Sequence, residues 1–456
     1  MSHAVVILAA GRGQRMHSEL PKLLHTIGGT TLIDHLLSTV SQIKPSKVVV
    51  VYGYQGEQLK NSVTEQTGLV WVNQGEQLGT GHATLQGLNA VAEAERVLIL
   101  YGDIPLINAD TLNRLLQETP IHEVGFVTIE VPNPTGLGRI VRDKKGQVKR
   151  IVEEKDATAN EKQIKEINAG FFVVPKSYLE KWLPNLTIGN NQQEYYLSDI
   201  ITMASTEGIA ITTVSPRFEW EILGVNDKMQ LAQLERYYQK EKANQLMQQQ
   251  GLTLLDPTRF DIRGELKVGK DVVIDINVIL EGKVIIGNKV TIGPNVYIKN
   301  SIIQDDVKIL ANSIIEDATI GKESVIGPFA RVRPGTVLAE KVKIGNFVEV
   351  KNTTIGRNSK INHLSYIGDA SIGQEVNIGA GTITCNYDGK KKHKTIIRDR
   401  VLIGSDTQLI APVTIGEDVT IGAGTTVVRD IPPKHLVHNR VEYRSVPDWS
   451  MDKELE

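Results

Sequence analysis

Residues 314–350 read IIEDATIGKESVIGPFARVRPGTVLAEKVKIGNFVEV, and an aliphatic residue recurs in this stretch at every sixth position. The series comprises Ile314, Ile320, Ile326, Val332, Leu338, Ile344 and Val350. A fixed period of six is typical of a parallel β-helix, in which each aliphatic residue points inward from one side of a coil. Ordinary antiparallel strands would instead show turn signals about every 8–12 residues, without a constant phase.

The same period occurs on both sides of this stretch. The upstream series is Ile274, Leu280, Ile286, Ile292 and Ile298. The downstream series follows slips near 351–355 and 367–372 and an insertion after Thr382, and it comprises Ile397, Ile403, Leu409, Ile415, Ile421 and Val427. A glycine often follows the aliphatic residue, where a tight corner favours a residue without Cβ. We therefore expect a β-helix over residues 251–437.

Three sides of six residues make a coil of about 18 residues, so positions 18 apart stack on successive coils. Arg333 and Lys351 are separated by 18 positions and each follows an inward aliphatic residue, which predicts a stacked basic pair. Ser405 and Ala423 are also separated by 18 positions. They predict a column of small residues, which suits a slender ligand lying along the helix.

The first half of the chain has a different pattern. Short apolar runs at 5–8, 48–51, 70–72 and 97–100 alternate with helical patterns such as 34–40 and 110–116. This alternation predicts an α/β domain with a mainly parallel, Rossmann-like sheet, and ligands bind such sheets at the carboxyl ends of the strands.

Residues 228–250 contain neither glycine nor proline and predict a linker helix that ends at Gly251. Its apolar residues are expected along one side of the helix: Met229, Leu231, Leu234, Tyr238 and Leu246.

Composition limits the possible functions. The 456 residues favour two or three domains, and a net charge of −2 gives no overall field for nucleic acid or anionic lipid.

Cys385, the sole cysteine, excludes an intrachain disulfide and fits a reducing compartment. It is interpreted as a small packed residue rather than a nucleophile. The N-terminus lacks a basic segment before its apolar run, and no apolar run approaches the roughly 20 residues of a membrane span. We expect a cytoplasmic protein.

Three polar motifs follow strands of the first half. LAAGRGQRM at 8–16, with Pro21 and Lys22, lets backbone N–H groups approach a phosphate beside the cations Arg15 and Lys22. The glycines alone favour a simple strand-to-helix turn with solvated basic residues. Asp103 follows the run at 97–100, where it can hold a divalent ion or cap a turn. The glycine-rich turn at 74–83 can present backbone groups to a base.

With PTGLGR at 134–139, INAG at 167–170 and GVN at 224–226, these motifs resemble those of sugar-phosphate nucleotidyltransferases. With the hexapeptide half included, the chain resembles the bacterial bifunctional N-acetylglucosamine-1-phosphate uridyltransferases and glucosamine-1-phosphate acetyltransferases, as far as about Arg440. The resemblance implies a nucleotidyltransferase domain at 1–227, a linker helix at 228–250, a left-handed β-helix acetyltransferase domain at 251–437 and a tail at 438–456. It also implies a homotrimer, with the acetyltransferase site built between subunits.

The resemblance assigns residues of the first half to the UDP-N-acetylglucosamine site. Those for uridine are Leu8, Ala9, Ala10, Gly11, Gln74, Gly79 and Thr80, and those for the sugar are Gly138, Glu153 and Asn168. Tyr101 and Gly102 belong to the same site. Arg15 and Lys22 would bind phosphates, and Asp103 and Asn226 would bind Mg²⁺. Glu154 remains an alternative to Glu153, and Asn226 is also a natural cap for the linker helix. The chemistry is in-line attack of the sugar 1-phosphate on the α-phosphorus of UTP, without a protein nucleophile.

The resemblance assigns a second set of residues to acetyl transfer. His363 matches a general base that takes a proton from the sugar amine, for which imidazole is suited. The glucosamine-1-phosphate set is Arg333, Lys351, Tyr366, Asn377 and Lys392, and the acetyl-CoA set is Ala380, Asn386, Tyr387, Ser405, Ala423 and Arg440. We expect the cationic pair to lie beneath the imidazole. Without the resemblance, a lone histidine is more often a surface residue, and the lysines at 390–394 are typical of a solvated loop.

The leading hypothesis is an enzyme with two activities. One half would make N-acetylglucosamine-1-phosphate from glucosamine-1-phosphate and acetyl-CoA, and the other would react it with UTP to give UDP-N-acetylglucosamine and pyrophosphate. A second hypothesis makes the β-helix a structural or allosteric module, but His363 and the basic pair argue against a passive prism. A third, non-catalytic sugar-nucleotide scaffold would be favoured if Asp103 or Lys22 were absent.

Overall fold

The computed structural model describes residues 2–64, 68–91, 93–439, 444–447 and 449, and the chain divides into two units, 1–238 and 239–456. The first unit is built on a nine-stranded sheet with the order β11-β7-β10-β6-β1-β4-β5, from which β8 (Arg139–Arg142) and β9 (Val148–Val152) branch. The strands on this path are β1 (His3–Ala9), β4 (Lys47–Tyr52), β5 (Leu69–Asn73), β6 (Arg96–Tyr101), β7 (Val124–Glu130), β10 (Glu166–Pro175) and β11 (Ile211–Val214). As predicted, the sheet is mainly parallel, although β10 runs antiparallel to β6 and β7.

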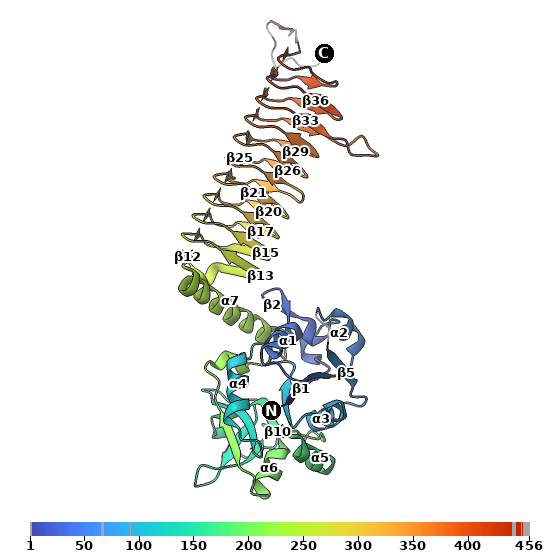
Figure 1. Cartoon of the computed structure of the whole chain (residues 1–456), viewed down its shortest axis with the longest axis vertical. Coiled ribbons are helices and arrows are strands. Elements are labelled where there is room, and N and C mark those ends of the chain that lie inside the picture. The colour runs from blue at the N-terminus through green and yellow to red at the C-terminus, as the bar shows by residue number, and fades with distance from the viewer. Residues whose placement is uncertain (1, 65–67, 92, 440–443, 448, 450–456) are drawn as a thin grey trace. The chain divides into compact units, whose positions relative to one another are not determined.

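Both faces of this sheet are buried, so its strands are continuously apolar rather than alternating. In β1, Val5 and Ile7 belong to one hydrophobic cluster, whereas Ala4 and Val6 belong to another on the opposite face. The helices are α1 (Leu32–Gln42), α2 (Gly56–Ser62), α3 (Thr80–Leu88), α4 (Ala109–Glu118), α5 (Lys176–Trp182) and α6 (Asp199–Thr206). Helices α3, α5 and α6 lie at one end of the unit in Figure 1.

The predicted linker helix is α7 (Lys228–Gln250), and Gly251 ends it with a left-handed φ of 67°. Leu234 and Leu246 are buried as expected. The prediction was wrong for Met229, whose side chain is 84% exposed. Five positions separate Met229 from Leu234, which turns Met229 roughly 140° away from the buried side at 3.6 residues per turn.

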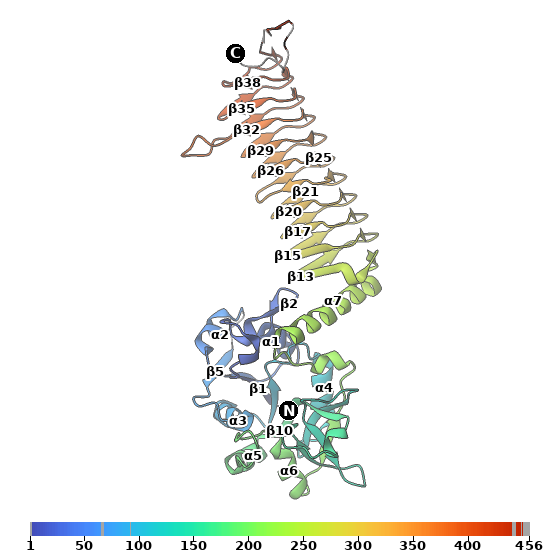
Figure 2. The ribbon, with the colours of Figure 1, turned by 180° about the vertical axis from the view of Figure 1, so that it is seen from behind.

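The second unit is a three-sided parallel β-helix. One side forms an eleven-stranded sheet, and the other two form a seventeen-stranded sheet. A representative coil comprises β23 (Arg331–Val332), β24 (Val337–Leu338) and β25 (Lys343–Asn346), and the next begins with β26 (Glu349–Lys351). Each strand pairs in parallel with the strand one coil later. Figure 2 shows the same succession of coils from behind.

Seven aliphatic residues recur at every sixth position in the stretch 314–350. Six of them, from Ile320 to Val350, point inward, and each is at most 1% exposed. The prediction was wrong for Ile314, which is 38% exposed, whereas its neighbour Ile315 is fully buried. The cause is the corner at Asp317, a left-handed residue with φ of 44°, because only five positions separate the inward residues Ile315 and Ile320 on either side of it. Ile315 therefore pairs with Val332, in a coil of 17 residues.

Candidate active sites of the two units

A cavity of about 970 Å³ lies at the carboxyl ends of β1 and β6 in the first unit. Most residues predicted for the UDP-N-acetylglucosamine site line it: Leu8, Ala9, Ala10, Gly11, Arg15, Lys22, Gln74, Gly79, Thr80, Tyr101, Asp103, Glu153 and Asn226. Gly102, Gly138 and Asn168 do not line it. The Gly102 N–H donates to the Leu8 carbonyl at 2.9 Å, and the Asn168 N–H donates to the Gly138 carbonyl at 2.9 Å.

Side-chain oxygens of Asp103 and Asn226 both lie close to the Lys22 ammonium in this cavity. The Lys22 ammonium lies 2.6 Å from Asp103 Oδ2 and 3.4 Å from Asn226 Oδ1. The cap of α7 is Asp227, whose Oδ1 accepts from the Gln230 N–H at 2.8 Å, so the Asn226 side chain is not used as the helix cap. Carboxylate and amide oxygens that share one positive charge also fit a hard divalent cation.

Asp103 and Asn226 would leave most of the coordination shell of such an ion to other ligands. Among the described residues, no group of three or more His, Cys, Asp or Glu side chains is arranged to hold a metal. Substrate phosphates and water would therefore complete the shell, as is usual for ions that bind together with a nucleotide.

Sequence reasoning missed the residue that fixes the loop at 8–16. Gln77 Nε2 donates to the Ala10 carbonyl at 2.7 Å, and Gln77 Oε1 accepts from Arg12 Nε at 2.9 Å. Gln77 belongs to a motif that the sequence analysis singled out, but only the fold shows that it crosses to the first loop.

The segment 190–198 was also missed, because it is polar and carries no periodic signal. The Tyr195 N–H donates to the Leu78 carbonyl, and the Gly81 N–H donates to the Tyr195 carbonyl, both at 2.8 Å. A Cβ on Gly79, whose φ is 111°, would lie 2.6 Å from the Tyr195 oxygen. Only glycine fits this close approach, which aligns the turn that lines the cavity.

The adjacent carboxylates Glu153 and Glu154 have different partners. Glu154 Oε2 accepts from Arg139 Nη2 at 2.6 Å and from the Gly136 N–H at 3.1 Å, and these bonds hold the pKa of Glu154 below its usual range. Glu153 accepts from Ser198 Oγ at 3.1 Å, and burial raises the pKa of its carboxyl despite that bond. Glu154 is thus committed to Arg139, whereas Glu153 retains acceptor capacity toward the cavity.

In the second unit, the predicted basic pair is stacked. The Arg333 N–H donates to the Val350 carbonyl at 2.8 Å, which sets Arg333 one coil before Lys351. Arg333 Nη1 also forms an ion pair with Glu349 Oε1 at 2.7 Å. Lys392 joins this cluster: its nearby ammonium, together with burial and the charge of Arg333, lowers the pKa of Lys351 although Asp369 opposes the change.

Lys392 reaches the cluster from an ordered insertion. The His393 N–H donates to the Asn386 carbonyl at 2.8 Å, and the backbones of Tyr387 and Lys392 form an antiparallel β-bridge. His393 Nε2 lies 2.6 Å from Asp388 Oδ2. The insertion projects from the coils beside β29 (Tyr366–Gly368) and β33 (Thr395–Ile397) in Figure 1. At its root, Asn386 Nδ2 lies 3.4 Å from the Tyr366 hydroxyl.

His363 ends β28 (Lys360–His363) on the eleven-stranded sheet. Its Nδ1 lies 3.0 Å from Oδ1 of Asn346, which is its partner one coil earlier. An amide oxygen can only accept a hydrogen bond, so this contact fits the neutral tautomer with its proton on Nδ1, which leaves Nε2 as an acceptor. Asn346 was missed because nothing in the hexapeptide pattern distinguishes it.

The predicted column of small residues stands directly above His363. Ile361, Ile378, Ile403 and Ile421 pair in succession, so the residues two positions later stack as well: His363, Ala380, Ser405 and Ala423. The register therefore confirms that Ser405 and Ala423 are stacked, and it adds His363 at the foot of the column. Asn377 begins β31 (Asn377–Ile378) on the same sheet.

The expectation that the cationic pair lies beneath the imidazole was wrong within one chain, because the two belong to different sheets. Arg333 directly follows β23 and Lys351 ends β26 in the seventeen-stranded sheet, whereas His363 lies in the eleven-stranded sheet. Cys385 is half-buried, and burial raises the pKa of its thiol. Arg440 lies outside the described residues.

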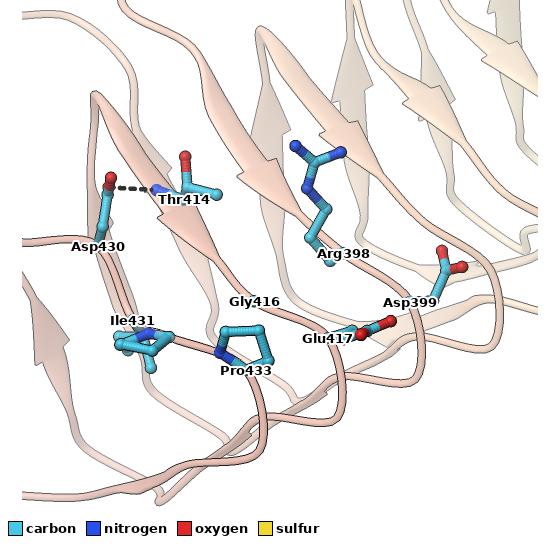
Figure 3. Close-up of a pocket in the computed structure, with 9 residues that line it drawn as sticks. Arg398, Asp399, Thr414, Gly416, Glu417, Asp430, Ile431 and Pro433 are labelled. Carbon is cyan, nitrogen blue, oxygen red and sulfur yellow. Dashed lines mark hydrogen bonds between the residues drawn. The ribbon is translucent and has the colours of Figure 1, made fainter.

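A second cavity of about 580 Å³ lies farther along the β-helix and is drawn in Figure 3. Arg398, Asp399, Glu417 and Asp430 contribute to its wall, and the Thr414 N–H donates to Asp430 Oδ1 at 2.7 Å. None of the described residues predicted for acetyl-CoA lines this cavity, so it is separate from the column above His363.

Comparisons with known proteins cover both units. Residues 5–253 match the MobA-like NTP transferase domain, residues 262–361 the GMPPB C-terminal domain, and residues 394–429 the bacterial transferase hexapeptide family (six repeats). The hexapeptide match agrees with the left-handed form of the parallel β-helix. The nucleotidyltransferase match implies a divalent metal ion.

Curated relatives match nearly the whole chain, and each is named Bifunctional protein GlmU. The relative from Nitrosomonas europaea is 49% identical over 446 residues, covering 98% of this chain and 97% of the relative. That from Methylococcus capsulatus is 51% identical over 450 residues, covering 98% and 97%. That from Acinetobacter baumannii is 48% identical over 455 residues and covers all of both chains.

Among the described residues, no helix is long and apolar enough to cross a membrane. Sequence identity near one half over full length, together with the two matched domain types, establishes the relationship. The chain belongs to the bifunctional GlmU family and is an enzyme of UDP-N-acetylglucosamine synthesis that combines a uridyltransferase with an acetyltransferase.

Proposed function

We propose that the cavity of the first unit carries out uridylyl transfer and that the surface around His363 carries out acetyl transfer. The observation that carries the first assignment is the convergence of Lys22, Asp103 and Asn226. The second rests on an imidazole with a free Nε2 at the foot of a column of small residues. The test is to supply purified protein with each substrate pair and to measure pyrophosphate release and CoA thiol release separately.

In uridylyl transfer, two anions must approach each other, so the protein mainly positions them and neutralises their charge. Asp103 and Asn226 would hold Mg²⁺, which supplies charge neutralisation at the phosphates when bound. Lys22 and Arg15 bring further positive charge to the same cavity. The turn residues Leu8 to Gly11, with Gln74, Gly79 and Thr80, would hold uridine, while Tyr101, Gly102, Gly138, Glu153 and Asn168 would form the sugar end.

Glu153 is proposed to accept a hydrogen bond from the sugar, since Glu154 is already bonded to Arg139. Glu153→Gln removes a charge-assisted bond, so we expect the KM for N-acetylglucosamine-1-phosphate to rise about 10- to 100-fold with little change in the KM for UTP. Glu154→Gln is the matched comparison. It should lower the Tm and leave that KM nearly unchanged. The reverse pattern in steady-state kinetics and thermal unfolding would assign the sugar contact to Glu154.

In acetyl transfer, His363 Nε2 would take a proton from the amine of glucosamine-1-phosphate as that amine attacks the thioester of acetyl-CoA. Asn346 fixes the orientation and tautomer of the ring through Nδ1. Ala380, Ser405, Ala423 and Arg440 would line the acetyl-CoA path, with Asn386 and Tyr387 between the substrates. Arg333, Lys351 and Lys392 would bind the phosphate, with Tyr366 and Asn377 at the sugar.

The acetyl-transfer site is proposed to be completed in a homotrimer, because one chain presents the imidazole and the cations on different sheets. An exposed apolar ridge next to His363 supports this proposal. Phe329, Phe347 and Leu364 form it at one corner of successive coils, where they are 49%, 57% and 63% exposed. All three have positive φ, which is unusual for bulky residues, and the same corner holds asparagines in earlier coils. An exposed apolar patch marks an interaction surface.

Phe347→Asp should therefore shift the protein from trimer toward monomer and lower acetyl transfer, because a charge is placed in the proposed contact. Light scattering coupled to gel filtration measures the mass. Asn312→Asp adds the same carboxylate to the same corner without removing an apolar ring, and it should remain trimeric. A wild-type monomer, or a fully trimeric Phe347→Asp variant, would contradict the role of the ridge.

The substrates are proposed to be UTP, N-acetylglucosamine-1-phosphate, glucosamine-1-phosphate and acetyl-CoA, all of them small molecules. A cytoplasmic location is also proposed, because all four substrates are small molecules. It is supported by a chain whose sole cysteine is free.

A further inference from the structure

Asp369 occupies a corner of the β-helix where short polar residues recur. It follows β29 with φ of 50°, and Asn300, Asp317 and Asn352 hold the same corner in earlier coils with φ of 44°, 44° and 45°. Asparagine and aspartate tolerate the left-handed conformation better than other residues with a Cβ. The corner residues also bond to one another: Asn300 Nδ2 donates to Asp317 Oδ1 at 3.2 Å, and Asn352 Nδ2 donates to Asp369 Oδ1 at 2.6 Å.

Asp369 differs from the other corner residues in what its second oxygen contacts. Asp369 Oδ2 accepts from Asn386 Nδ2 at 2.6 Å and lies 4.0 Å from Lys351 Nζ. Its carbonyl accepts from the Thr395 N–H at 3.2 Å, where the insertion rejoins the coils. At Asp317, the next coil instead contributes Gly335, which has no side chain. The Asp369 carboxylate thus links the corner ladder to the root of the insertion.

Both oxygens of Asp369 accept hydrogen bonds from amide groups, which a neutral asparagine could not reproduce because it has a single acceptor oxygen. With Nδ2 given to Asp369, Asn386 retains its Oδ1 as an acceptor at the place proposed between the two substrates. The side chain of Asp369 is 13% exposed, so these bonds are largely shielded from water.

Charge gives Asp369 a second effect. The charged groups that face Lys351 are Lys392 from the insertion, Arg333 directly after β23 and Asp369 itself, while Glu349 is paired with Arg333. Burial alone would raise the pKa of Asp369, but the bonds from Asn352 and Asn386 and the charges of Lys351 and Lys392 hold it below its usual range. Asp369 is therefore an anion that favours the charged form of Lys351, against two neighbouring cations.

We propose that Asp369 is a positioning residue for acetyl transfer: its carboxylate fixes Asn386 at the root of the insertion and keeps Lys351 charged for the substrate phosphate. This inference rests on the proposed function of the second unit, since it concerns the site assigned there to glucosamine-1-phosphate. Asp369 touches neither substrate in this account. It acts through Asn386 and Lys351.

The test is Asp369→Asn, which keeps a residue that this corner accepts at 300 and 352 but removes one acceptor and the charge. We expect the KM for glucosamine-1-phosphate to rise about tenfold or more, as for loss of a charge-assisted bond. Removing the anion lowers the pKa of Lys351 further, so the rise in KM on the alkaline side should begin at a lower pH than in the wild type. Hydrogen exchange at Asn386 to Thr395 should become faster as the root loosens.

Asp317→Asn is the matched control, because it makes the same change at the same corner of an earlier coil, away from the insertion. It should leave the KM and its pH dependence as in the wild type. The proposal is overturned if the folded Asp369→Asn variant keeps the wild-type KM, pH profile and exchange rates, or if both variants change alike. Absence of acetyl transfer in the wild-type protein would instead overturn the proposed function on which it rests.

Discussion

Replacing His363 with alanine is expected to lower acetyl transfer by about 10²- to 10⁴-fold, the range that general-base catalysis contributes. The variant loses the Nε2 that is proposed to accept the amine proton, while the cations proposed to bind the phosphate, Arg333, Lys351 and Lys392, are unchanged. The loss should therefore appear mainly in kcat, with the KM for glucosamine-1-phosphate nearly constant. Release of the CoA thiol, followed continuously, measures both parameters.

The matched control for this variant is His435→Ala. His435 is an exposed histidine of the same unit whose Nδ1 lies 2.9 Å from the Pro433 carbonyl, and it belongs to neither proposed site. Its removal should leave acetyl transfer unchanged. A fall in kcat of less than about tenfold in folded His363→Ala would remove the imidazole from the role of base, because the expected contribution is at least an order of magnitude larger.

Asp103→Ala is expected to lower uridylyl transfer by about 10²- to 10³-fold, the range for losing one preorganised electrostatic group. The change removes the carboxylate that lies 2.6 Å from Lys22 and would hold Mg²⁺ with Asn226. The variant should also require a higher Mg²⁺ concentration for half-maximal rate. Pyrophosphate release across a Mg²⁺ titration measures both effects.

Asp110→Ala provides the control, since Asp110 is an exposed carboxylate in the first turn of α4 that pairs with Arg217 at 3.0 Å, outside the cavity. It should behave as the wild type. A chelator should abolish uridylyl transfer by the wild-type protein and leave acetyl transfer intact. Equal Mg²⁺ requirements in Asp103→Ala and the wild type would exclude Asp103 from the metal site.

The periodic parts of the structure were predictable from the sequence, because a constant phase reports a constant geometry. The six-residue period predicted the inward residues from Ile320 to Val350, and it placed Arg333 beside Lys351 one coil later. The same reasoning failed at Ile314, because a one-residue shortening at Asp317 shifts the phase without changing the composition.

The contacts that join distant segments could not be predicted in this way. Gln77 crosses to the Ala10 loop, and Tyr195 pairs with the turn at Gly79, but neither carries a periodic signal. Glu153 bonds to Ser198 and Glu154 bonds to Arg139, and only the fold brings these partners close. The sequence alone left two roles for Asn226, metal ligand or helix cap. Asp227 caps the helix, so the side chain of Asn226 is free to contact Lys22.

The central claim is that one chain carries two independent sites that act in sequence. The direct measurement is to supply glucosamine-1-phosphate, acetyl-CoA, UTP and Mg²⁺ to His363→Ala, to Asp103→Ala and to their mixture, and to quantify UDP-N-acetylglucosamine. We predict that neither variant alone forms the product at more than a small fraction of the wild-type rate and that the mixture restores it. Rapid product formation by either variant alone, or none from the mixture of folded variants, would contradict the account.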